Sequence, residues 1–373
     1  MYASFIIISF LLLIPIGVYL YFYLLRMADF WKLKFKAKKI KMSAALIAIL
    51  AVMCSVNLFG FGALVVLHMI AAALCMEILN IIFTALHKHK IIKIDLWNKI
   101  FYCGAMPIII TALILGYGYF NMGNVIETDY TIHTEKPVSE HGYKIALVAD
   151  LHFGTTMNEV KLKKYCNEIE SKKPDLVVLC GDIVDERTTR VQMENAAKIL
   201  GSIKSTYGTF YVYGNHDKST YTSKPNFNEK QLKNQLVSNG IHVFEDEVYN
   251  VNHNLTIIGR KDKGFSPGIK RKTSEELLKN ADTHNFLLLL DHQPSDLQQN
   301  SAAGIDLQLS GHTHGGQIWP MGLISHRLGF NQISYGYKNI GKYQIIVTSG
   351  MGGWGYPIRT GHHSEYVIVN VKK

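Results

Sequence analysis

Residues 143–152, YKIALVADLH, combine the two features that decide the fold of the second half of this chain. The first seven residues form a largely apolar run, and the next three introduce an aspartate and a histidine. Short apolar runs bounded by turn residues are typical of buried β-strands. Ligand sites in layered α/β proteins lie at the carboxyl ends of strands. We therefore predict a strand over 143–149, with Asp150 and His152 at a ligand site where it ends.

Four more apolar runs are each followed by polar residues of the same kinds. They are 175–180 (DLVVLC) before Gly181-Asp182, 209–213 (TFYVY) before Gly214-Asn215-His216, 286–290 (FLLLL) before Asp291-His292, and 306–309 (DLQL) before Ser310-Gly311-His312. Glycine permits sharp turns, which let the following side chain face a shared pocket. One such motif alone is more often a solvated turn. Five in order, each beside a strand, favour a common site.

The residue types of these motifs indicate metal chemistry. Carboxylates, an amide oxygen and imidazoles together form the ligand set for two adjacent divalent metals. Two metals about 3.5–4 Å apart clamp the attacking and leaving oxygens of a phosphoryl displacement. Mixed nitrogen and oxygen ligands suit manganese, iron or zinc better than calcium. The motifs therefore predict a metal-dependent phosphoesterase.

The order D-x-H, G-D-x-x-D, G-N-H-D, H and G-H-x-H resembles that of the calcineurin-like metallophosphoesterase superfamily. The run GHTHGGQIWP at 311–320 is similar to a membrane-anchored subgroup with N-terminal transmembrane helices, found in bacteria and animals. The resemblance covers residues 142–371. It implies an α/β fold, a four-layer α/β/β/α sandwich in which two stacked sheets lie between helices.

The resemblance also implies which side chains hold the two ions. Each metal has four protein ligands, and one carboxylate bridges both together with a hydroxide that acts as the nucleophile. The implied ligands are Asp150, His152, Asp182 and His314 for the first metal, and Asp182, Asn215, His292 and His312 for the second.

Three further residues are candidates for roles in catalysis. His216 follows the ligand Asn215 and is expected to stabilise the phosphoryl oxygens or protonate the leaving alkoxide. Asp185 resembles the family carboxylate that orients this histidine by accepting an N–H; its alternative role is helix capping. Arg359 lies in the glycine-rich stretch 350–361, where related proteins often have Pro-x-Arg, and is a candidate phosphate clamp.

The first third of the chain has the composition of a membrane region. Residues 5–25, 43–86 and 101–120 are apolar tracts with almost no charge, and about 20 apolar residues span a bilayer. The middle tract is long enough for two helices. We therefore predict four spans, at about 5–25, 43–61, 63–86 and 101–120, the alternatives being a soluble core helix or a signal peptide. The first tract lacks the basic start and the cleavage site of a secretory signal.

Basic residues indicate the orientation of these spans. Residues 1–120 carry 11 basic and 3 acidic residues, which accounts for +8 of the net charge of +10. The basic residues lie in the connections around 26–41 and 88–99, and the positive-inside rule places both in the cytoplasm. The chain is thus predicted to be a multi-pass protein of the cell membrane with an extracytoplasmic catalytic domain. We attribute the excess of basic residues to the attraction between these connections and anionic lipid headgroups. No nucleic-acid partner is expected.

Three expectations concern smaller segments. Residues 121–141 are expected to be a polar linker with one β-type patch at 130–133, before a catalytic domain at 142–373. Residues 260–275 form a basic, turn-rich segment that is either a loop meeting a phosphate or lipid headgroup, or a solvated charge run. Glu77, in the third span, is expected to be protonated and hydrogen-bonded, without His68 as a partner.

Two classes of function follow. The first is a membrane-anchored hydrolase of phosphomonoesters or phosphodiesters, for which the tether favours lipid-linked substrates. The alternative is a non-catalytic membrane sensor or scaffold that retains the metal-binding fold. The complete ligand set favours the enzyme.

Overall fold

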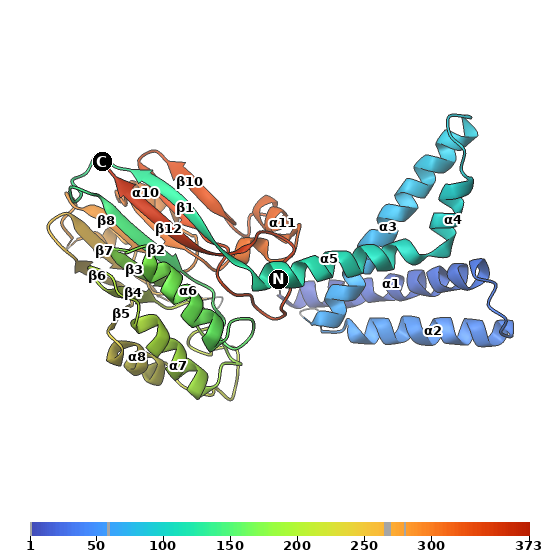
Figure 1. The fold of residues 1–373 in the computed structure, drawn as a ribbon, viewed down its shortest axis with the longest axis horizontal. Coiled ribbons are helices and arrows are strands. Elements are labelled where there is room, and N and C mark those ends of the chain that lie inside the picture. Colours follow the sequence, from blue (N-terminus) through green and yellow to red (C-terminus); the bar gives the residue numbers. More distant parts are fainter. Residues whose placement is uncertain (1, 58–59, 265–269, 280) are drawn as a thin grey trace. The chain divides into compact units, whose positions relative to one another are not determined.

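Two six-stranded β-sheets form the centre of residues 118–373, the larger of the two units into which the chain divides (Figure 1). The computed structural model describes residues 2–373 apart from 58–59, 265–269 and 280. The first sheet contains, in spatial order, β1 (Val125–His133), β12 (Ser364–Lys372), β2 (Tyr143–Val148), β3 (Leu176–Cys180), β4 (Thr209–Val212) and β5 (Ile241–Phe244). The second contains β10 (Gly336–Ile340), β11 (Tyr343–Val347), β9 (Leu307–Ser310), β8 (Phe286–Leu290), β7 (Leu255–Gly259) and β6 (Glu247–Asn250).

The five strands predicted from apolar runs are β2, β3, β4, β8 and β9. In the first sheet β2, β3, β4 and β5 are parallel neighbours. In the second sheet β7, β8, β9 and β11 are parallel neighbours. Strands buried on both faces need no alternation of polar and apolar residues, which is why each appears in the sequence as a continuous apolar run. The parallel direction brings the residues after these strands to the same edge of each sheet.

Three apolar clusters establish the layer order. The outer cluster of the first sheet packs strand residues such as Val148 against α6 (Glu159–Ser171), α7 (Arg190–Gly201) and α8 (Glu229–Ser238). The central cluster joins the two sheets face to face, with Leu147 from one and Leu288 from the other. The outer cluster of the second sheet includes residues of α9 (Ser274–Leu278) and α10 (Leu297–Ala302). The predicted α/β/β/α order is confirmed.

The segment predicted as a linker contains a strand. β1 pairs in parallel with β12 along its whole length, from Val125 opposite Ser364 to His133 opposite Lys372. Val125 and Ile132 are buried, while the charged residues between them keep the segment polar in composition. An edge strand needs few apolar residues because it is partly solvated. The β-type patch predicted at 130–133 is therefore the end of a longer strand, and the segment predicted as a linker is ordered in a sheet from Val125 to His133.

Residues 1–117 form the other unit and are mainly helical. The helices are α1 (Tyr2–Phe30), α2 (Ala37–Cys54), α3 (Phe61–Lys88), α4 (Asp95–Cys103) and the greater part of α5 (Ala105–Gly123). Within the described residues, three segments are long and apolar enough to cross a membrane: Leu11–Phe30, Phe61–Lys88 and Ala105–Gly123.

The second of the four predicted spans, 43–61, is not among these three. The helix at this position, α2, ends at Cys54 and has three lysines near its start, so its apolar part is short. The fourth span begins later than predicted, because Phe101 belongs to the separate helix α4. That helix stops at Gly104, whose φ of 68° is readily adopted by glycine. The count of four spans remains a prediction.

Glu77 has a cationic partner. Its Oε1 lies 2.7 Å from Nη1 of Arg26 and accepts a hydrogen bond of 3.0 Å from the hydroxyl of Tyr19. The guanidinium of Arg26 also lies over the ring of Phe101, 4.2 Å from its centroid. The expected hydrogen bond of Glu77 is confirmed, and its contact with Arg26 joins α1 to α3.

Candidate metal centre

The predicted ligands follow the carboxyl ends of five strands in both sheets. Five of the seven have positive φ values, an uncommon conformation for residues other than glycine. They are Asp150 (53°), His152 (41°), Asp182 (51°), His312 (73°) and His314 (51°). Such conformations persist only where the surrounding structure enforces them, and they cluster at functional sites. The backbone is bent at the points where each side chain must turn towards the site.

One cluster contains Asp150, His152 and His314, with one ligand atom from each within 4.8 Å of the others. The Nε2 atoms of the two histidines are 3.3 Å apart, and Nε2 of His314 is 3.7 Å from Oδ1 of Asp150. Asp150 and His152 are fully buried. Two imidazoles and a carboxylate directed at one point form a donor set that fits zinc, manganese or iron.

The second cluster contains Asp182, His292 and His312. Nε2 of His292 lies 3.2 Å from Oδ2 of Asp182. The side-chain oxygen of Asn215 joins the cluster, at 3.2 Å from Nε2 of His292 and 2.9 Å from Nδ1 of His312. The structure therefore brings together all four side chains predicted for the second metal.

Asp182 lies between the two clusters. The same oxygen that approaches His292 is 3.8 Å from Nε2 of His152 in the first cluster. This is the position required of a bridging carboxylate. A side chain at residue 214 would block it, because a Cβ there would lie 2.1 Å from Oδ1 of Asp182. The glycine of the Gly-Asn-His motif thus leaves room for the shared ligand.

The pKa shifts of three predicted ligands suit metal binding. His292 is an exception: burial lowers its pKa, but Asp182 beside it raises that pKa well above the ordinary value. Burial lowers the pKa of His312 to about 3 and holds the pKa of His314 well below its ordinary value. Burial also opposes ionisation of Asp182, but the neighbouring His292 outweighs it and keeps the pKa of this carboxyl well below its usual range. Neutral imidazoles and ionised carboxylates are the forms that bind metals.

Asp217 supports the bridging residue and was quoted in the sequence motif without a role. Its buried carboxylate accepts backbone N–H bonds from Asp182 (2.7 Å), Ile183 (2.9 Å), Val184 (3.1 Å) and Gly214 (2.6 Å). Four donors on one carboxylate lock the turns after β3 and β4 together. The final letter of Gly-Asn-His-Asp was the signal for this function.

His216 lies beside the clusters and pairs with Glu186. Its Nδ1 is 2.9 Å from Oε2 and 3.1 Å from Oε1 of that glutamate. Its ring centroid is 5.2 Å from that of His152. Burial lowers the pKa of His216, but the bond to Glu186 and the nearby carboxylates raise it above the ordinary value overall. An imidazole held in this way at Nδ1 has its Nε2 available for proton transfer.

Among the described contacts, Asp185 has none with His216. The residue that contacts the imidazole of His216 is Glu186, the next in the sequence. Oδ2 of Asp185 is instead 3.5 Å from Nδ1 of the ligand His152. Its Oδ1 accepts backbone N–H bonds from Arg187 and Thr188, as a turn-capping residue does. Asp185 therefore backs a metal ligand and closes the turn before α7. Sequence reasoning assigned Asp185 to His216 and did not consider the adjacent Glu186, which makes this contact in the structure.

Arg359 is fully buried, which contradicts the predicted role of phosphate clamp. Its Nη1 donates to the carbonyl oxygen of His314 at 2.8 Å, and its Nη2 donates to that of Gly352. Burial lowers its pKa to about 10, which still leaves it charged at neutral pH. The guanidinium therefore holds the backbone of a metal-ligand loop from behind.

The arginines of the basic segment 260–275 are also engaged within the protein. Nη1 of Arg271 lies 3.0 Å from Oδ2 of Asp291, and Arg260 pairs with Asp296 at 3.1 Å. These pairs contradict the solvated charge run for both arginines and leave neither directed at a substrate. Residues 265–269, the middle of the segment, lie outside the described residues.

The chain resembles known proteins over the region that contains these clusters. The family profile described as calcineurin-like phosphoesterase matches residues 143–316. A metallophosphoesterase of Aquifex aeolicus is 34% identical over 247 residues, which cover 65% of this chain and 90% of that protein. A metallophosphoesterase of Campylobacter jejuni is 31% identical over 265 residues, covering 68% of this chain and 66% of that protein.

A transmembrane protein with a metallophosphoesterase domain from Danio rerio is 29% identical over 280 residues, covering 72% of this chain and 62% of that protein. Its name agrees with the apolar N-terminal helices found here, and the two observations support a membrane protein. The match with the Aquifex protein spans nearly all of that relative, and the profile match includes every predicted metal ligand. The chain therefore belongs to the calcineurin-like phosphoesterase family.

Proposed function

We propose that this chain is a membrane-anchored phosphoesterase with a two-metal centre formed by the clusters around Asp150 and His292. The observation that carries the proposal is the Asp182 carboxylate, which reaches imidazoles of both clusters at 3.2 and 3.8 Å. Two divalent cations bound there supply Lewis acidity for the phosphoryl oxygens and lower the pKa of an attacking water. The complete clusters support a hydrolase over a scaffold that only retains the fold.

His216 serves as the proton donor to the leaving alkoxide. Glu186 accepts a hydrogen bond from Nδ1–H and thereby fixes the imidazole with Nε2 as the catalytic nitrogen. When the P–O bond breaks, the electron pair stays on the leaving oxygen, and the Nε2 proton of the imidazolium neutralises it. The raised pKa of His216 keeps this proton available near neutral pH. Both phosphomonoesters and phosphodiesters meet these requirements.

Turnover of an aryl phosphate by the full chain in detergent, with manganese, iron or zinc added, tests the proposal. We expect metal-dependent release of the phenol and its loss on chelation. A purified chain that binds two metal equivalents and hydrolyses neither aryl monoesters nor aryl diesters would contradict the enzyme and support the scaffold.

The membrane arrangement is part of the proposal. The three candidate spans support a membrane protein. The orientation also needs the predicted fourth span over 43–61, because only then do the basic connections around 26–41 and 88–99 both lie in the cytoplasm and the catalytic unit outside it. In intact cells, cysteine tags near Lys36 and Lys90 are expected to resist a membrane-impermeant thiol reagent, whereas a tag near Lys263 reacts. Mass mapping of the labelled peptides separates the tags from the native cysteines. The opposite pattern would place the site in the cytoplasm.

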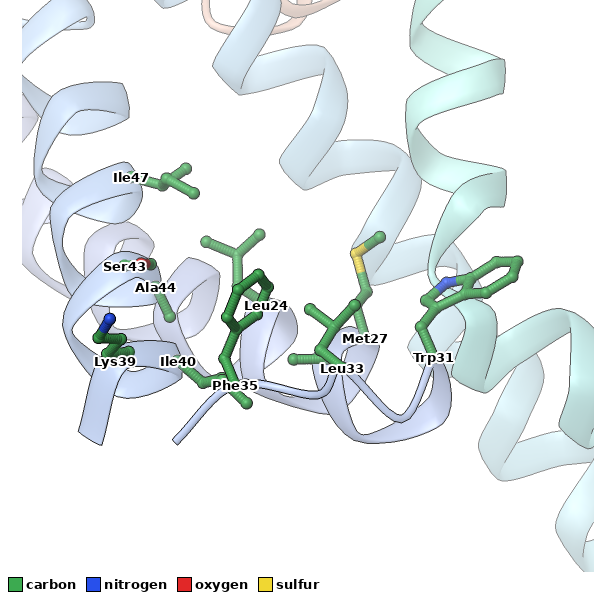
Figure 2. A pocket seen from close by; sticks show the side chains of 11 residues that line it. Leu24, Met27, Trp31, Leu33, Phe35, Lys39, Ile40, Ser43, Ala44 and Ile47 are labelled. Atoms are coloured by element: carbon green, nitrogen blue, oxygen red, sulfur yellow. The ribbon is translucent and has the colours of Figure 1, made fainter. Parts of the chain in front are cut away.

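Lipid is the partner that the first unit best accommodates. A pocket between the end of α1 and the start of α2 is lined mainly by apolar side chains, with Lys39 and Ser43 as its polar members (Figure 2). An acyl chain suits the lining, and an anionic headgroup suits the lysine. This pocket supports membrane lipid as a partner. The proposal of a lipid-linked phosphoester as the substrate rests on the tether alone.

A further inference from the structure

The segment 319–330, here called the apolar segment, exposes large apolar side chains in an unbroken stretch of the catalytic unit. It consists of helix α11 (Met321–Arg327) and its flanks, and none of the seven residues of the helix is buried. The exposed members are Trp319, Met321, Leu323, Ile324, Leu328 and Phe330, with exposed fractions from 40% to 70%. Contiguous apolar patches on soluble domains mark interaction sites. Most other exposed large apolar residues of this unit, such as Val191 and Val237, are isolated.

The sequence on either side of the apolar segment contains no acidic residue that would be repelled by anionic lipid. Between Asp306 and Glu365 the sequence contains no aspartate or glutamate, and the ionisable residues of the segment itself are His326 and Arg327. An exposed tryptophan among Leu, Ile, Met and Phe, with a neighbouring cation, is the composition of segments that lie in a bilayer interface. The chemistry favours a lipid surface as the occupant.

Hydrogen bonds tie the apolar segment to the end of a candidate membrane span. The backbone N–H of Trp319 donates to the hydroxyl of Thr360 at 3.1 Å, and the N–H of Thr360 donates to the carbonyl of Gln317 at 2.9 Å. The adjacent Arg359 donates its N–H to the carbonyl of Gly118, in the last turns of α5, at 3.0 Å. The segment is therefore fixed to residues with which α5 enters the catalytic unit.

Two aromatic residues extend the same surface character. Tyr119 and Phe120, at the catalytic end of α5, are 58% and 75% exposed. Aromatic side chains are enriched where membrane helices meet the headgroup layer. They follow Gly118 directly in the sequence. Two aromatic residues typical of the headgroup layer therefore lie next to the hydrogen bond between Arg359 and Gly118.

The apolar segment is also fastened to the metal-ligand loop. Thr313, between the ligands His312 and His314, donates its hydroxyl to the carbonyl of Ser334 at 2.6 Å, and the hydroxyl of Ser334 donates to the carbonyl of Gly322 in α11 at 3.1 Å. A Cβ at Gly316 would lie 2.2 Å from the backbone nitrogen of Gly322, so the loop and the helix touch backbone to backbone. Whatever holds α11 also sets the position of the ligand loop.

We propose that the apolar segment docks on the surface of the bilayer beside the end of α5 and holds the metal centre at the depth of phosphate-bearing lipid headgroups. The evidence for the docking is the exposure of the apolar side chains of 319–330, the absence of acidic residues from the surrounding sequence, and the hydrogen bonds that connect the segment to the end of α5. The substrate class that it implies, phosphoesters anchored in the same bilayer, rests on the proposed function.

Photo-cross-linking of the full chain in vesicles of phosphatidylethanolamine and phosphatidylglycerol tests the docking. Benzoylphenylalanine replaces Leu323 or Phe330 in the apolar segment, or Val237 on α8 as the control, since Val237 (54%) matches Leu323 (55%) in exposure. Burial of one such side chain is worth about 1.5–3 kcal/mol, so lipid adducts at 323 and 330 are expected to exceed those at 237 by about tenfold or more. Equal yields, or cross-links mainly to a second protein chain, would overturn the proposal.

A kinetic comparison tests the substrate class. The full-chain double variant Leu328→Gln, Phe330→Gln is compared with Val237→Gln on ethyl p-nitrophenyl phosphate in solution and on a long-chain alkyl p-nitrophenyl phosphate in the same vesicles. The double variant is expected to lose about tenfold on the vesicle substrate alone, with Val237→Gln unaffected. Equal losses on both substrates would overturn the link to lipid substrates. If the unaltered chain hydrolyses neither, the proposed function fails, and cross-linking alone decides the docking.

Discussion

Residues 118–373 and residues 1–117 differ in how deeply they bury their charged side chains. The catalytic unit buries several carboxylates at strand ends, including Asp150, Asp182, Asp217 and Asp291, each at most 1% exposed. The membrane unit presents apolar side chains on its surface, and its ion pair between Arg26 and Glu77 remains partly exposed. A buried charge is costly unless paired or bound to a metal. A concentration of them at four strand ends is therefore expected where cations bind, as in the proposed metal centre.

The difference implies that charge removal has different consequences in the two units. In the catalytic unit it should abolish chemistry, because the charges hold the metals and a proton. In the membrane unit it should weaken helix association and leave the chemistry intact.

Asp182→Asn is expected to have the largest effect. The amide loses the negative charge shared by both clusters, so at least one metal equivalent should be lost. Turnover should fall by about 10³-fold or more, since the ions supply several kcal/mol of stabilisation. Elemental analysis together with aryl phosphate turnover measures both effects, with Glu194→Gln on the surface of α7 as the control. Retention of two metals with normal turnover would show that Asp182 bridges nothing.

His216→Ala should separate the proton donor from the ligands. Metal content should remain at the wild-type value while kcat falls by roughly 10²–10⁴-fold, the range for a positioned acid. The loss should be smaller for aryl phosphates with good leaving groups, which need less protonation. Loss of metal in this variant would make His216 a ligand.

Glu186→Gln and Asp185→Asn distinguish two adjacent carboxylates. Glu186 contacts His216, so its variant should lower kcat by about 10–100-fold at unchanged metal affinity. Asp185 backs His152, so its variant should weaken metal binding by a similar factor and recover turnover at high metal concentration. Metal titrations of turnover decide between them. The reverse pattern would restore the role that the sequence suggested for Asp185.

Glu77→Gln is expected to have the smallest effect. The pair with Arg26 is partly exposed, so its loss should cost about 1–2 kcal/mol, between values for exposed and buried pairs. Thermal unfolding of the full chain in detergent should begin a few degrees lower, while aryl phosphate turnover stays unchanged. A large loss of turnover with the same unfolding temperature would give Glu77 a part in the reaction.

The sequence predicted which candidate ligands lie close together because each follows an apolar run that forms a strand. Apolar runs, glycines and ligand residue types are all local features, and parallel strands bring their ends together. The partners behind the ligands depend on side-chain directions, which spacing does not determine. Asp185 and Glu186 are neighbours with opposite directions, and Arg359 lies in a loop whose burial only the packed structure reveals.

The less accurate predictions concern segments whose amino-acid composition does not indicate the structure that they adopt. β1 carries charged residues but pairs along nine positions with β12. α2 belongs to an apolar tract in the sequence, yet the helix includes three lysines and ends at Cys54. Of the apolar segment 319–330, the sequence indicated only Trp319 and Pro320, as the end of a family motif, because the exposure of the rest depends on α11 having no buried residue.

The most direct test of the two-metal centre is electron paramagnetic resonance of the full chain loaded with manganese. Two ions about 3.5–4 Å apart with a shared carboxylate should be exchange-coupled, giving a broad spectrum that collapses to that of isolated Mn(II) in Asp182→Asn. The resolved hyperfine pattern of isolated, uncoupled Mn(II) in the unaltered chain at two bound equivalents would contradict the central claim.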